Sequence, residues 1–109
     1  MAGKFELKVA SNGKYHFNLK AGNGQIILSS EMYESKSAAE NGIASVSKNA
    51  ADDARFERKE SSNGKNYFNL KASNGQVVGK SEMYESASAM ENGIASVASN
   101  APGAHTVEA

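Results

Sequence analysis

The sequence predicts an α+β fold in which two β-β-β-α-β units share one mainly antiparallel sheet, with two helices on one face. Three observations predict it. At an offset of 51 residues, 5–50 align with 56–101 without a gap, and about 70% of the paired positions are identical. Apolar residues alternate with polar ones in short runs of each copy, as in half-buried strands. Further along each copy, they recur at helical spacing.

The duplication predicts how the units are organised. Because open arrays of repeats usually need three or more units to cover their ends, two copies predict a closed pair related by a pseudo-twofold axis. A chain of 109 residues is expected to form one domain, residues 1–109. The predicted segments are 5–50 for the first repeat, 56–101 for the second and 104–108 for a closing strand.

Each repeat is predicted to begin with a three-stranded meander. In the first copy, Phe5, Leu7 and Val9 alternate with charged residues, and Asn12-Gly13 is expected to supply the positive φ angles of a tight hairpin turn. The second strand is predicted from the apolar residues at 15, 17, 19 and 21. A second Asn-Gly pair then leads into a third strand over 25–29.

A helix follows in each repeat. Ser37 and Glu40 fit a capping box at its start, and Asn49 is expected to end it in a left-handed conformation. Gly42 lies inside the helix, where we expect it to allow a close approach of the backbone to the sheet or the partner helix. The predicted apolar stripe of the first copy is Ala39, Ile43, Val46 and Ala50.

The first strand of each copy and the C-terminal segment predict where the outer strands of the sheet lie. Leu7 and Val9 become Arg58 and Glu60 in the second copy, so we expect this strand to lie at a sheet edge, where charged residues protect against aggregation, or to cross between the halves. The offset also aligns Val107 with Phe56 and Phe5, so all three are expected to fill the core from equivalent strands. The remaining predicted core residues are Phe17, Leu19, Ile43, Val46, Phe68, Leu70, Ile94 and Val97.

Several motifs resemble one known family. Phe-Asn-Leu-Lys-Ala at 17–21 and 68–72, Ser-Glu-x-Tyr at 30–33 and 81–84, and Asn-Gly-Ile-x-Ser-Val at 41–46 and 92–97 resemble the YegP-like proteins, a bacterial group of unknown function. The resemblance covers nearly the whole chain twice. It implies one sheet shared by two units that exchange their last strands, and it brings no known activity, ligand or catalytic residue.

Composition narrows the classes of function. Twelve basic and twelve acidic side chains balance, so no overall charge attracts the chain to nucleic acid or anionic lipid. The absence of cysteine excludes disulfides and cysteine-ligated metals. No apolar run reaches the ~18 residues of a membrane span, and the start lacks the apolar core of a signal peptide. We therefore expect a cytoplasmic protein, with no membrane association, that is a monomer with an internal pseudo-dimer.

The outward face of the meander is the first candidate surface. Lys8 and Lys59 extend it, and a basic sheet carrying an aromatic residue is a possible platform for a small anion or single-stranded nucleic acid. A solvated sheet face is the favoured interpretation, because aromatic and arginine residues are sparse there. The candidate residues are His16, Asn18, Lys20, Tyr67, Asn69 and Lys71.

The SEMYES connection, at 30–35 and 81–86, is the second candidate surface. Its glutamates and tyrosines could bind a cation or a peptide. The favoured alternative is structural, with the tyrosines filling the core and Ser35 or Ser37 capping the helix. The residues concerned are Glu31, Tyr33, Glu34, Glu82, Tyr84 and Glu85.

Catalysis is the least supported function. His16 and His105 are not repeated between the copies, and no spacing of His, Asp and Glu indicates a metal site. We predict no catalytic residue, cofactor or metal ligand. Three hypotheses remain in order: a non-catalytic binding or accessory module with a protein partner, a binder of small anions or nucleic acid, and a small metal-dependent enzyme.

Overall fold

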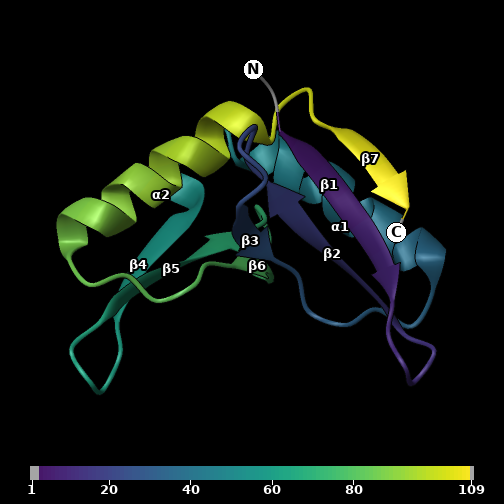
Figure 1. Cartoon of the computed structure of the whole chain (residues 1–109), viewed down its shortest axis with the longest axis horizontal. Coiled ribbons are helices and arrows are strands. Elements are labelled where there is room, and N and C mark those ends of the chain that lie inside the picture. Colours follow the sequence, from purple (N-terminus) through teal and green to yellow (C-terminus); the bar gives the residue numbers. More distant parts are fainter. Residues whose placement is uncertain (1–2, 109) are drawn as a thin grey trace.

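The computed structural model describes residues 3–108 and contains one seven-stranded sheet in the order β4-β5-β6-β3-β2-β1-β7 (Figure 1). Every neighbouring pair is antiparallel except β1 and β7, which run parallel. The predicted α+β class is confirmed. The elements are β1 (Lys4–Val9), β2 (Tyr15–Lys20), β3 (Ile26–Ser29), α1 (Lys36–Asn49), β4 (Phe56–Glu60), β5 (Asn66–Lys71), β6 (Val77–Lys80), α2 (Ala87–Asn100) and β7 (His105–Glu108), with a short 3-10 turn at Asp53–Arg55.

The two repeats meet at the middle of the sheet. β3 and β6 are joined by a single ladder pair, Ser29 with Lys80, and these two residues are equivalent in the two copies. The pseudo-twofold axis therefore passes between them, perpendicular to the sheet. α1 packs on β2 of its own repeat and on β5 and β6 of the other, while α2 packs on β5 and β3. Each helix thus covers the seam between the repeats.

The last strand crosses to the other repeat. β7 ends the second repeat and pairs with β1 of the first, which confirms the predicted strand exchange. β4 lies at the opposite edge, as its charged residues predicted. In Figure 1, β7 and β4 flank the two sides of the sheet, with β3 and β6 between them.

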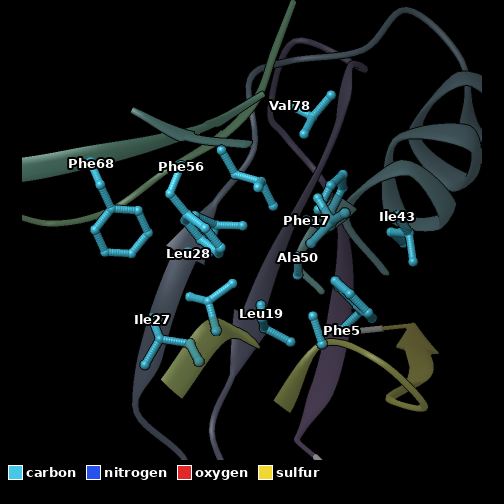
Figure 2. Packing of buried hydrophobic residues seen from close by; sticks show 14 of the residues in the cluster. Phe5, Phe17, Leu19, Ile27, Leu28, Ile43, Ala50, Phe56, Phe68 and Val78 are labelled. Atoms are coloured by element: carbon cyan, nitrogen blue, oxygen red, sulfur yellow. The ribbon is translucent and has the colours of Figure 1, made fainter. Parts of the chain in front are cut away.

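One buried cluster joins the two halves (Figure 2), and the eight remaining core residues predicted from the sequence all lie in it. A bulge between β2 and β3 places two consecutive residues, Ile27 and Leu28, in this cluster. The same bulge recurs in the second repeat. The cluster is Phe5, Leu7, Phe17, Leu19, Ile27, Leu28, Ala39, Ile43, Val46, Ala50, Phe56, Phe68, Leu70, Val78, Met90, Ile94, Val97 and Ala101.

One predicted core residue, Val107, is wrong, and one apolar position of the first predicted strand is not buried. That position, Val9, is 60% exposed, because it ends β1 beside the hairpin, where its partner Tyr15 is itself only partly buried. Val107 is exposed because β7 runs outside β1 instead of occupying the position of β1. Its register partner is Glu6, so it lies on the face opposite the helices.

At the helix start the structure selects one of the two predicted caps, and the predicted helix end is wrong. Ser35, not Ser37 of the capping box, is the N-cap, and its hydroxyl accepts a hydrogen bond from the amide of Ala38 at 3.1 Å. Asn49 is helical and does not adopt a left-handed conformation; its side chain donates to the carbonyl of Ser45 at 2.8 Å. Because its side-chain amide is hydrogen-bonded within the last turn, Asn49 remains part of the helix.

The hairpin turns differ in detail from the prediction. Gly13 has a φ of 82°, but no non-glycine residue between 3 and 108 has a positive φ, so Asn12 does not adopt one. Instead, the side-chain oxygen of Asn12 accepts a hydrogen bond from the amide of Lys14 at 3.0 Å. The connection is therefore a longer turn with one glycine in the left-handed region.

Candidate functional site

The open face of the sheet, away from the helices, brings several candidate residues into one row. Cross-strand register places Asn18 beside Ser29, Ser29 beside Lys80, and Lys80 beside Asn69. Residues paired in this way project from the same face of a sheet. The row therefore joins both repeats across the pseudo-twofold axis.

The lysines beside this row are neutralised by carboxylates of the sheet. The ammonium of Lys20 lies 3.3 Å from the carboxylate of Glu6, and that of Lys71 lies 3.0 Å from Glu57. Lys8 also contacts Glu6, at 3.4 Å. An anionic ligand at Lys20 or Lys71 would have to displace these partners, so the geometry weighs against the open face as an anion or nucleic-acid site.

The same pairs perturb the glutamates. The hydrogen bond from Lys20 holds the pKa of Glu6 below its usual value, against the opposing effect of desolvation. The hydrogen bond from Lys71, followed by that from Asn69, does the same to the pKa of Glu57. Both carboxylates are therefore more acidic in the folded chain than in the unfolded one.

This difference predicts a pH dependence of stability. A lowered pKa in the folded state contributes stability that is present above the unfolded value of about 4.3 and is lost as the pH falls through the folded value. The double variant Glu6→Gln/Glu57→Gln is expected to have a lower urea midpoint than the parent at pH 7. The two midpoints should converge toward pH 3, and a gap independent of pH would contradict the assignment.

The ring of Tyr67 is in contact with a lysine of the neighbouring strand. The ammonium of Lys80 lies over its ring, 5.0 Å from the centroid, as in a cation–π contact. A base stacking on that face of the ring would have to move Lys80. Its counterpart in the first repeat is His16, which is partly buried on β2.

The tyrosines of the two SEMYES connections pack inward. The ring of Tyr33 stacks on Phe17, with centroids 6.1 Å apart, and that of Tyr84 stacks on Phe68 at 6.3 Å. A Cβ atom on Gly42 would collide with the hydroxyl of Tyr33. This contact explains the helical glycine. Burial raises the pKa of both tyrosines. This packing indicates a structural role for Tyr33 and Tyr84.

The glutamates of the same connections fall into two groups. Glu34 pairs with Lys14 at 2.8 Å and Glu85 with Lys65 at 2.7 Å, an arrangement repeated in both halves. Among residues 3–108, neither Glu31 nor Glu82 has an ion-pair partner.

These two carboxylates line a cavity of about 600 Å³ at the seam. Its lining comes from β3, β6 and the residues that follow them, with none from either helix, so it opens on the side away from the helices. Ile26 and Val77 contribute exposed apolar surface, 44% and 38% exposed. The lining residues are Ile26, Ile27, Leu28, Ser29, Ser30, Glu31, Val77, Gly79, Lys80, Ser81 and Glu82.

Most residues that line this cavity, the seam groove, were not predicted as site residues from the sequence. The available signal was a run of four consecutive differences between the copies, at 26–29 and 77–80, inside an otherwise well-matched repeat. A seam on a pseudo-twofold axis brings equivalent positions together, so identical residues there would meet each other. Differences between the copies therefore concentrate where the repeats touch.

No group of three His, Asp or Glu side chains between residues 3 and 108 is arranged to hold a metal ion. In the same part of the chain, neither helix is long and apolar enough to cross a membrane.

Comparisons with known proteins agree with this architecture. The sequence profile of a family described as "Domain of unknown function (DUF1508)" matches residues 10–57 and 61–108. A UPF0339 protein of Bordetella pertussis is 59% identical over 106 residues, covering 97% of this chain and 95% of its own. The solution structure of the Escherichia coli protein of unknown function YegP has a TM-score of 0.94 and 52% identity, covering 99% of this chain and 93% of its own. A UPF0339 structure from Shewanella oneidensis gives 0.93 and 47%, covering 99% and 92%.

Proposed function

This chain belongs to the DUF1508 family, whose function is unknown, and from that premise we propose that it is a non-catalytic binding module that meets a protein partner at the seam groove. One observation carries the proposal: the cavity of about 600 Å³ lies on the pseudo-twofold axis and takes its lining from both repeats. Ligand sites commonly combine apolar walls with a few polar groups, as this groove does.

A protein partner fits the groove better than a polyanion. Of the three titratable residues in the lining, Glu31 and Glu82 are acidic and only Lys80 is basic. The neighbouring Lys20 and Lys71 are paired with carboxylates. Phosphate groups along a nucleic acid need uncompensated positive charge, and this surface supplies little of it.

Site-specific photo-crosslinking in the native cells tests the proposal. A photoreactive amino acid at Ile26 or Val77, both exposed in the groove, is expected to give the same protein adduct. The matched control is Val9, which is exposed and apolar but lies outside the groove. Ser29→Trp, which fills the groove from its exposed face, should abolish the adduct while thermal stability is retained.

Two results would overturn the proposal. One is an adduct of equal yield from Val9, which would indicate non-specific capture. The other is an adduct from Ile26 or Val77 that persists when Ser29→Trp occupies the groove, since the partner would then contact another surface.

A further inference from the structure

The charged residues in the seam groove alternate in sign. Glu31, Lys80 and Glu82 all line it, and no opposite charge lies within ion-pair distance of any of them among residues 3–108. Lys80 belongs to the ladder pair on the pseudo-twofold axis, so its backbone lies between the two glutamates along the seam, while its ammonium lies over the ring of Tyr67. The groove therefore presents negative, positive and negative charge in that order.

The spacing of these charges follows from strand geometry. Glu31 lies two residues past Ser29, the last residue of β3, and Glu82 lies two residues past Lys80, the last residue of the antiparallel β6. With a rise of about 3.3 Å per residue of extended chain, the Cα atoms of these two glutamates are about 13 Å apart along the seam. An extended peptide covers this distance in about four residues, and its residues i, i+2 and i+4 project from one face.

Apolar surface lies beside each carboxylate. Because β3 and β6 run antiparallel from their single ladder pair, Glu31 and Val77 lie toward one end of the seam. The equivalent residues Glu82 and Ile26 lie toward the other end. A lysine or arginine side chain has an apolar stem and a charged head, so it matches an aliphatic residue next to a carboxylate.

We propose that the seam groove binds an extended segment of a partner protein that carries basic residues at i and i+4 and an acidic residue at i+2. The acidic residue draws the ammonium of Lys80 away from the ring of Tyr67, and the basic residues meet Glu31 and Glu82 at the two ends. This inference rests on the proposed function, because it specifies the partner of the same groove. Alternating charges fix both the spacing and the class of the segment.

Short synthetic peptides test the charge order. The matching peptide has lysine at positions one and five, aspartate at position three and serine between them. Its control has the charges inverted, with aspartate at one and five and lysine at three. Titration into the ¹⁵N-labelled protein is expected to shift the backbone amides of 26–31 and 77–82 with the matching peptide, and to leave them in place with the inverted one.

Two double variants, each removing two glutamates from the same loops, provide a matched comparison. Glu31→Gln/Glu82→Gln removes the groove carboxylates and should weaken binding of the matching peptide about tenfold. Glu34→Gln/Glu85→Gln removes the same charge from glutamates that pair with Lys14 and Lys65 outside the groove. We expect that second variant to change affinity by less than about twofold, because rim charges remote from a contact contribute little.

A charge-inverted protein gives a positive test. The triple variant Glu31→Lys/Lys80→Glu/Glu82→Lys should prefer the inverted peptide, and its unchanged circular dichroism would show that the fold is kept. Equal binding of both peptides by the parent, or equal loss in the two glutamine variants, would overturn the inference. If the inverted peptide shifts the groove amides of the parent, the charge class is wrong but the groove remains a binding surface. If neither peptide shifts them, the inference fails, and the crosslinking experiment alone decides the proposed function.

Discussion

Residues 1–51 produced alone are expected to remain unfolded as a monomer, with a loss of essentially the whole folding free energy of about 5–15 kcal/mol. α1 packs on β5 and β6 of the second repeat as well as on β2 of its own, so a separate first repeat exposes that surface. It also loses β7, which the second repeat contributes beside β1. Neither repeat can complete its own core.

Circular dichroism and sedimentation measure this directly. The first half should show no cooperative thermal transition at a concentration where the intact chain is fully folded. An equimolar mixture of 1–51 and 52–109 is expected to regain the transition, since the halves supply surface to each other. A cooperative monomer of residues 1–51 with the melting temperature of the whole chain would contradict this mutual completion of the two repeats.

Much of this architecture was predictable because its signals are local. Phe17 and Leu19 alternate with polar residues, and Ile43 and Val46 share one face of a helix, so each pattern indicates a buried side without knowledge of its partner. The duplication then predicts that the second repeat does the same. These predictions are confirmed because burial in each element follows its own periodicity.

The failed prediction for the closing strand depended on which segment of the chain takes the position beside β2. Val107 was expected to be equivalent to Phe5, but the place beside β2 is already taken by β1. The closing strand therefore runs outside β1, and its register turns Val107 to the open face. Sequence alignment compares positions along a chain and does not show which of two competing segments occupies the inner strand.

The candidate site was less predictable than the fold. Glu31 and Glu82 were identified from the repeated SEMYES segment, yet so were Tyr33 and Tyr84, which pack into the structure. The groove itself results from two strands that share only one ladder pair. How far β3 and β6 separate beyond this pair depends on the angle between the repeats, and no local sequence pattern predicts that angle.

Gly79→Leu is expected to destabilise the seam, because Leu28 of the other repeat already fills the position. A Cβ atom on Gly79 would lie 2.7 Å from the Cγ atom of Leu28, too close for either side chain to remain in place. Leu28 is 1% exposed and belongs to the central cluster (Figure 2), so it cannot move into solvent. Overpacking of this kind costs about 1–3 kcal/mol and occasionally more.

The pair explains why the copies differ on the axis. Leu28 and Gly79 are equivalent positions next to the pseudo-twofold axis. The side chain of Leu28 occupies the space that a side chain at position 79 would need. Two leucines would overfill that space and two glycines would leave a cavity. Leu28→Gly is therefore also expected to destabilise, by about 2–5 kcal/mol, through the loss of a buried leucine.

The reciprocal variant Leu28→Gly/Gly79→Leu separates complementarity from the individual costs. It places one leucine on the opposite strand and keeps the total volume, so its unfolding free energy should lie within about 1.5 kcal/mol of the parent. Urea denaturation of the four proteins gives the coupling energy of the pair, for which we expect at least about 1.5 kcal/mol, because the two single losses together exceed that of the double variant by at least this amount. Additive losses in the double variant would show that the leucine is fixed by its own repeat. Recovery would show that the two repeats fit each other at the axis through one large and one absent side chain.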